Sequence, residues 1–195
     1  MEKKEFLERI LDIISKEIIP ETKKSVEEGN KVFGGAIVNK SDLSTVMLGT
    51  NKEIENPLFH GEISTLNNFF ALSAKHNVKD LLFISTHEPC PMCLSAITWA
   101  GFDNIYYFFD YQDTLETFNI AHDLNILKDV FGRSDGEYNR KNSFWQSFWI
   151  KTLIDQEKEP NRKILIEKSG LITQAYKSLS ENYQKTKKKN NIPLN

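Results

Sequence analysis

The sequence is poor in cysteine and carries little net charge. It holds two cysteines in 195 residues, and 25 Lys and Arg against 27 Asp and Glu give a net charge of -2. Two cysteines cannot build a disulfide scaffold or a four-cysteine zinc site. The near-neutral balance argues against a protein that coats nucleic acid, because such proteins are usually basic.

Long hydrophobic runs are also missing. No run approaches the roughly 20 apolar residues that span a bilayer, so the sequence predicts no membrane segment. Residues 1–5 are mixed in charge and Asp12 interrupts the apolar stretch that follows, which is a poor match to an export signal. We therefore expect a cytoplasmic protein, in which a disulfide between the two cysteines would be unusual.

Hydrophobic periodicity indicates the fold class. The helical pattern predicts helices over 3–19 (with a restart after Pro20), 60–75, 90–100, 144–156 and 162–187, with 122–131 as helix or loop. Short apolar runs predict strands over 33–38, 44–48, 81–85 and 104–109. Helices that alternate with buried strands favour an α/β protein with a layered sheet.

Two short motifs place reactive side chains at predicted helix starts. His60-x-Glu62 opens one helix, and Pro89-Cys90-x-x-Cys93 opens another directly after a buried strand. Both sulfurs can reach one metal ion from a first helical turn, and a helix N-terminus favours thiolates. His60 supplies a third ligand. Three protein ligands leave one tetrahedral position for water, which is typical of a catalytic zinc site.

Glu62 lies two residues from the expected ligand His60, beside the expected water. Zinc lowers the pKa of such a water towards ~7, and a carboxylate there can pass its proton to a leaving nitrogen. The conjunction H-x-E…P-C-x-x-C is the signature of zinc-dependent base deaminases. Three other interpretations stay open: a redox pair of Cys90 and Cys93, a structural zinc site with Glu62 or His87 as fourth ligand, and a core position for His60.

These motifs resemble those of the cytidine deaminase-like superfamily, in the branch of bacterial guanine deaminases, tRNA adenosine deaminases and fungal cytosine deaminase. The resemblance covers roughly residues 30–125. It implies a three-layer α/β/α sandwich with a mixed five-stranded sheet, followed here by C-terminal helices. It also implies one Zn²⁺ per subunit, held by His60, Cys90 and Cys93, with Glu62 as the catalytic residue.

The resemblance further implies substrate-binding residues. Phe33 and Gly34 look like the family's first strand, whose glycine lets a substrate approach the backbone. Asn51 looks like the asparagine that holds the base, although a plain turn residue is the alternative. Phe59, directly before the ligand His60, is expected in the pocket wall.

The hints about the substrate conflict. Residues 60–66 are similar to the motif of fungal cytosine deaminase, whereas residues 88–93 are similar to the purine deaminase motif. Trp99 matches a pocket tryptophan of guanine deaminases and favours guanine, but a core aromatic on a helix face explains it nearly as well. Those enzymes also carry a downstream acid.

Two aspartates are candidates for that downstream acid. Asp113 precedes Glu116 by three residues, so we interpret it as a helix cap in a capping box. Asp123 is then the expected pocket acid. We expect His87 in a loop near the edge of the zinc site.

Taken as one chain, residues 1–195 are predicted to form a single domain, with a deaminase core at 30–125 and a C-terminal helical extension at 140–190 packed on it. The predicted function is zinc-dependent hydrolytic deamination of a small-molecule nucleobase or nucleoside, with guanine favoured. The alternatives are a cytosine, cytidine or tRNA adenosine deaminase and a catalytically silent zinc-binding scaffold. The family commonly pairs subunits, so we expect a homodimer; the acidic balance disfavours nucleic acid without excluding tRNA.

Overall fold

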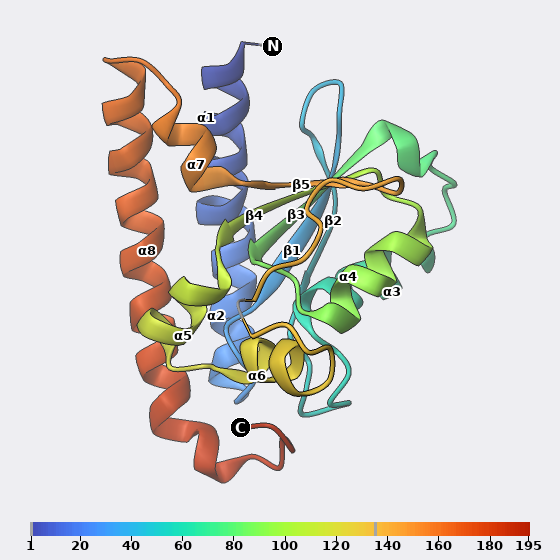
Figure 1. The fold of residues 1–195 in the computed structure, drawn as a ribbon, viewed down its shortest axis with the longest axis vertical. Coiled ribbons are helices and arrows are strands. Elements are labelled where there is room, and N and C mark those ends of the chain that lie inside the picture. The colour runs from blue at the N-terminus through green and yellow to red at the C-terminus, as the bar shows by residue number, and fades with distance from the viewer. Residues whose placement is uncertain (1, 135) are drawn as a thin grey trace.

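The computed structural model describes residues 2–134 and 136–195, and its centre is a five-stranded sheet (Figure 1). The strands lie in the order β2-β1-β3-β4-β5. β1 pairs antiparallel with β2 and β3, whereas β3, β4 and β5 are parallel. The mixed sheet confirms the predicted fold class. The strands are β1 Gly34–Asn39, β2 Thr45–Thr50, β3 Leu81–His87, β4 Asn104–Phe109 and β5 Gln146–Trp149.

Helices cover both faces of this sheet and make the predicted three layers. α1, α2, α5, α7 and α8 lie on one side, and α3 and α4 lie on the other (Figure 1). A hydrophobic core lies on each face of the sheet. Because side chains alternate along a strand, Ala36 and Val38 of β1 pack into the core under α1 and α8, and Ile37 packs into the core under α3 and α4. The helices are α1 Lys3–Ile13, α2 Ile19–Glu27, α3 Gly61–Phe70, α4 Pro91–Ala100, α5 Tyr111–Phe118, α6 His122–Asp129, α7 Ile150–Asp155 and α8 Asn161–Thr186.

The first helix does not break before Pro20. A π-helical turn, Ile14–Ile18, joins α1 to α2, and Pro20 lies in the first turn of α2. A proline is tolerated there because the first N–H groups of a helix need no intrahelical partner. Two further short 3₁₀ turns are Val78–Asp80 and Lys187–Lys189.

The predicted helix over 144–156 is wrong in its first half. Residues Gln146–Trp149 form β5, and the helix α7 begins only at Ile150. β5 covers the open edge of β4, which would otherwise expose unpaired backbone groups. Its aromatics suit a strand: Phe148 stacks on Tyr106 with ring centroids 4.7 Å apart. The extension at 140–190 therefore contributes a strand to the sheet as well as helices.

Two further local predictions are corrected. His87 is the last residue of β3, fully buried rather than in a loop. The cap of α5 is Asp110, and Asp113 is its reciprocal partner: the Asp113 N–H donates to Asp110 at 2.7 Å, and the Asp110 N–H donates to Asp113 at 3.3 Å. The capping box is real but begins three residues earlier than expected.

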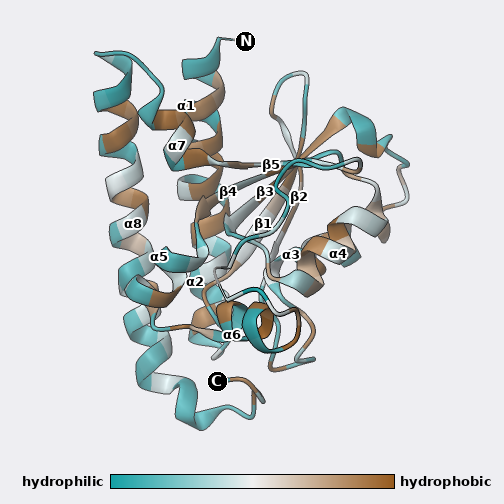
Figure 2. Cartoon of the chain, viewed as in Figure 1, coloured by the Kyte–Doolittle hydropathy of each residue, from teal (hydrophilic) through white to brown (hydrophobic). Residues whose placement is uncertain are grey.

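The long helix α8 brings the C-terminal part of the chain back to the N-terminal helices. α8 packs against α1 and α2, where Lys168 pairs with Asp12 at 3.0 Å. Hydrophobic residues gather in the strands and α1, whereas the end of α8 is mainly hydrophilic (Figure 2). None of the helices in the described part of the chain combines the length and apolarity needed to cross a membrane.

Candidate zinc and active site

Three potential metal ligands meet where two helices begin. His60 is the N-cap residue of α3, Cys90 is the N-cap residue of α4, and Cys93 lies in the first turn of α4. The Nδ1 atom of His60 lies 3.6 Å from the sulfur of Cys90 and 3.7 Å from that of Cys93. Neither cysteine forms a disulfide. The structure thus brings together the three ligands that the motifs predicted.

The spacing of these atoms fits a zinc ion. Bonds of about 2.0–2.1 Å to nitrogen and about 2.3 Å to sulfur, at a tetrahedral angle, place the nitrogen roughly 3.5 Å from each sulfur. The three ligand atoms all lie within 4.8 Å of one another. In residues 2–134 and 136–195, this is the one group of His, Cys, Asp and Glu close enough to hold a metal.

The local electrostatics favour a thiolate at the start of α4. A hydrogen bond from Cys93 and the neighbouring His60 hold the pKa of Cys90 well below its usual range. Burial raises the pKa of Cys93. Burial alone would lower the pKa of His60, but the hydrogen bond and charge of Cys90 raise it to about 9. The negative charge that gathers here is what a divalent cation would neutralise.

Glu62 lies next to the ligand group in the first turn of α3. Its Oε1 accepts a hydrogen bond from Ser85 at 2.9 Å, and its Oε2 accepts one from the Cys93 thiol at 3.4 Å. Burial, followed by the charge of Cys90, raises the pKa of the Glu62 carboxyl. A carboxylate that is oriented and has a raised pKa can both take up and release a proton.

The loop that carries Cys90 is braced from behind by Glu88. The Tyr138 hydroxyl donates to its carboxylate at 2.7 Å, Arg140 at 3.1 Å and the Tyr111 N–H at 3.2 Å. Burial raises the pKa of Glu88 despite the Arg140 charge. The ligand Cys90 is thereby tied to the segment before β5.

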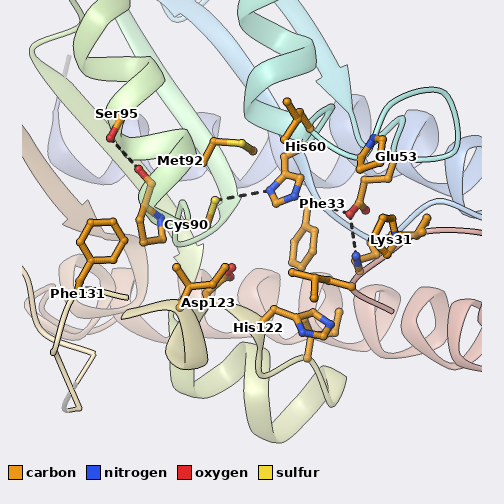
Figure 3. A pocket seen from close by; sticks show the side chains of 18 residues that line it. Lys31, Phe33, Glu53, His60, Cys90, Met92, Ser95, His122, Asp123 and Phe131 are labelled. Carbon is orange, nitrogen blue, oxygen red and sulfur yellow. Dashed lines mark hydrogen bonds and ion pairs between the residues drawn. The ribbon is translucent and has the colours of Figure 1, made fainter. Parts of the chain in front are cut away.

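A mainly apolar pocket of about 440 Å³ opens beside the ligands (Figure 3). His60 and Cys90 form one side of it, with Phe33 next to His60, and Asp123 and Phe131 lie across from them. The other lining residues are Lys31, Glu53, Pro57, Leu58, Pro91, Met92, Ser95, Ile120, His122, Ile126, Ile192, Pro193 and Leu194.

Two of the predicted substrate-binding residues, Phe33 and Asp123, line this pocket. Asp123 lies in the first turn of α6. Loss of solvent around it, together with the charge of Cys90, raises the pKa of its carboxyl to about 8. The structure therefore places this acid in the lining of the pocket, beside the zinc ligands.

The other four predicted pocket residues do not line the cavity. Trp99 is 91% exposed on the outer side of α4, so it is neither a pocket wall nor a core aromatic. Phe59 is half-buried outside the lining. Gly34 serves packing, because a Cβ on it would lie 2.6 Å from the Ile18 side chain. Asn51 is fully buried, and the Oδ1 atom of its side-chain amide accepts the Gly61 N–H at 2.5 Å.

Sequence reasoning missed Lys31 and Glu53, and it left open whether the C-terminal tail covers the site. Lys31 and Glu53 form an ion pair at 2.7 Å in the pocket wall, and Ile192–Leu194 reach the pocket from beyond α8. Tyr176 and Tyr183 of α8 are buried in the core and do not line the pocket. Nothing in the local sequence signals these positions, since each depends on chain segments that meet only in the fold.

Comparison with known proteins agrees with this geometry. The family model described as "Cytidine and deoxycytidylate deaminase zinc-binding region" matches residues 11–109. The chain belongs to this family. The match contains both motifs and ends before Asp123, so the three ligands lie in a zinc-binding region of the family.

Individual relatives differ in their substrates. The chain is 34% identical over 89 residues to a cytosine deaminase of Candida albicans. This match covers 45% of this chain and 58% of that protein. It is 29% identical over 86 residues to a guanine deaminase of Bacillus subtilis, covering 43% and 54%. The structure of a guanine deaminase from Nitrosomonas europaea matches with a TM-score of 0.55 at 16% identity, covering 86% of this chain and 81% of that one. The chain thus spans little more than half of the two sequence relatives, and the structural likeness shows the fold.

Proposed function

We propose that this protein is a zinc-dependent hydrolytic deaminase of a nucleobase or nucleoside, which releases ammonia. The observation that carries the proposal is a group of one nitrogen and two sulfur ligands, with the Glu62 carboxylate hydrogen-bonded to one of the sulfurs, beside a pocket of about 440 Å³. A structural zinc site has no use for an oriented carboxylate with a raised pKa at that place.

Each residue of the site has a distinct role in the proposed reaction. The pocket holds a planar base with its amino-bearing carbon towards His60 and Cys90. Zinc bound there supplies a Lewis-acid position for one water molecule and lowers the pKa of that water. Glu62 would take one proton from the water and pass it to the ring nitrogen as the new carbon–oxygen bond forms. It would then take the second proton of the former water and pass it to the amine, which leaves as ammonia when the carbon–nitrogen bond breaks. Ser85 keeps the carboxylate oriented through its 2.9 Å hydrogen bond.

An uncharged substrate fits the charges of the pocket. Lys31 is the one Lys or Arg among the described lining residues, and it is paired with Glu53 at 2.7 Å. A phosphate monoester needs free cationic donors or a helix N-terminus; the first turn of α6 already carries Asp123. A nucleobase or nucleoside is therefore favoured over a nucleotide or tRNA.

Guanine is our first choice of base, because Asp123 lies where the resemblance to guanine deaminases expects an acid. The Trp99 hint no longer supports it, since that side chain is outside the pocket. Cytosine or cytidine is the alternative, favoured by the motif at residues 60–66 and by the 34% identity to a cytosine deaminase. A catalytically silent zinc scaffold is the rival of a different class. A cytoplasmic homodimer remains our expectation for the working form.

Ammonia release from the zinc-loaded protein tests these options. The panel is guanine, cytosine, adenosine, cytidine, deoxycytidylate and a tRNA anticodon stem-loop, with zinc content measured on the same sample. We expect stoichiometric zinc and turnover of guanine. Turnover of cytosine or cytidine instead would select the alternative. Bound zinc with no ammonia from any compound would favour the silent scaffold, and a faster reaction with deoxycytidylate than with cytidine would refute an uncharged substrate.

A further inference from the structure

Lys31 and Glu53 form a buried ion pair in the pocket wall. Their side chains are 5% and 2% exposed, and the Lys31 Nζ lies 2.7 Å from Oε1 of Glu53. Removing two charges from water costs several kcal/mol per ion, and an apolar pair of similar volume is often as stable. Stability alone is therefore a weak reason for the chain to hold this pair beside the zinc ligands.

Glu53 is also tied to the start of α3. Its Oε2 accepts a hydrogen bond from the Asn51 side-chain amide at 2.6 Å. The carbonyl oxygen of the same Asn51 amide accepts the Gly61 N–H, directly after the ligand His60. Lys31 thus pairs with one oxygen of the Glu53 carboxylate, and Asn51 ties the other oxygen to the start of α3.

The fixed carboxylate faces the outer nitrogen of the ligand histidine. His60 turns Nδ1 towards the two sulfurs, at 3.6 and 3.7 Å, and turns Nε2 towards Oε1 of Glu53, at 3.7 Å. Figure 3 shows Glu53 between His60 and Lys31. Metal-binding histidines commonly donate their second N–H to a carboxylate, which fixes the ring and its tautomer.

We propose that Glu53 is the positioning residue that orients His60 for zinc, that Asn51 holds Glu53 in place, and that Lys31 compensates its buried charge. This rests on the ligand set of the proposed function. The separation of 3.7 Å has to shorten by roughly 0.7 Å to become an ordinary hydrogen bond. If the ion pair served folding alone, replacing it would change zinc affinity only as far as it changes stability.

Two variants separate positioning from folding. Lys31→Met leaves Glu53 opposite His60 but strands a buried carboxylate, so we expect a large loss of stability and zinc affinity within about threefold of wild type. The double variant Lys31→Met/Glu53→Leu removes both charges, so we expect stability closer to wild type and zinc affinity lower by about 10- to 100-fold. The two readouts should therefore rank the variants in opposite orders.

The experiment measures zinc dissociation constants by competition with a chromophoric chelator, and stability by urea unfolding, on the full chain. Glu55→Gln, which alters an exposed carboxylate of the same loop, is the control and should match wild type. Glu53→Gln, the mildest change, should weaken zinc binding about tenfold and serves if the double variant does not fold.

Zinc affinity unchanged in the double variant, or in folded Glu53→Gln, would overturn the role of Glu53. A parallel fall of affinity and stability in both Lys31 variants would do so too. A wild-type protein that binds no zinc would refute the ligand set itself.

Discussion

The two walls of the pocket are built in different ways. The wall of His60 and Cys90 lies at two helix N-termini, and hydrogen bonds satisfy its polar groups. The wall of Asp123, Phe131 and Ile192–Leu194 comes from α6 and the chain end, beyond the family match at 11–109. Phe131 and Leu194 are still 58% and 54% exposed. The first wall thus lies within the family match, and we propose that the second wall determines the fit to the substrate.

We expect the largest loss of activity from a substitution of Glu62, which lies next to the ligands of the first wall. We expect Glu62→Gln to lower turnover by about 10²- to 10⁴-fold, because the amide cannot accept the water's proton. Zinc content should stay at the wild-type level, since the three ligands are intact. Steady-state ammonia release and metal analysis measure the two quantities. Glu55→Gln is the matched control, and wild-type turnover in Glu62→Gln would remove Glu62 from the mechanism.

The second wall is tested at Asp123. Asp123→Asn should lower kcat/KM for guanine by about 10²-fold, the lower end of a general acid–base contribution, and should leave zinc affinity unchanged. Asp129→Asn, an exposed carboxylate at the end of the same helix, should behave as wild type. If Asp123→Asn deaminates guanine normally, the second wall only covers the site, and the case for guanine is lost.

We expect a smaller effect, on the pH dependence of stability, at the buried His87. This ring packs against Phe33, Phe109, Phe118 and Tyr176, and its Nε2 has no hydrogen-bond partner in the described structure. Burial, with a contribution from Lys151, holds the pKa of His87 well below its usual range.

The folded state therefore takes up this proton less readily than the unfolded chain, whose histidine pKa is near 6.5. The His87 contribution to stability is complete above about pH 6.5 and is lost as the pH falls, by about 1.4 kcal/mol per pH unit. In His87→Phe this loss should be absent. Urea unfolding from pH 7 to 5 measures it, with His76→Gln in an exposed loop as control. Parallel curves for wild type and His87→Phe would show that His87 titrates normally.

The contrast between the walls also explains what the sequence could predict. His60, Glu62, Cys90 and Cys93 were found because a metal site at a helix start needs ligands only two or three residues apart. Most helices and strands followed from period, which is equally local. Asp123 needed the resemblance, since its distance along the chain from the motifs carries no signal.

The misses all depend on contacts between distant segments. The aromatics of 144–149 fit a helical period as well as a strand, and only the free edge of β4 decides for β5. Lys31 and Glu53 look like ordinary charged loop residues until the fold buries them together. Trp99 lies on the predicted helix, but its direction, away from both core and pocket, follows from how α4 packs.

The tail has a practical consequence for handling the protein. Asn190 donates a hydrogen bond to the Gly29 carbonyl at 2.8 Å, which directs the following residues, Ile192–Leu194, onto the pocket. The last residues of the tail therefore lie at the pocket, whereas α1 begins at the opposite end of the molecule (Figure 1). An affinity tag or fluorophore attached at the C-terminus would compete with substrate for the entrance, and one attached before α1 would leave it clear.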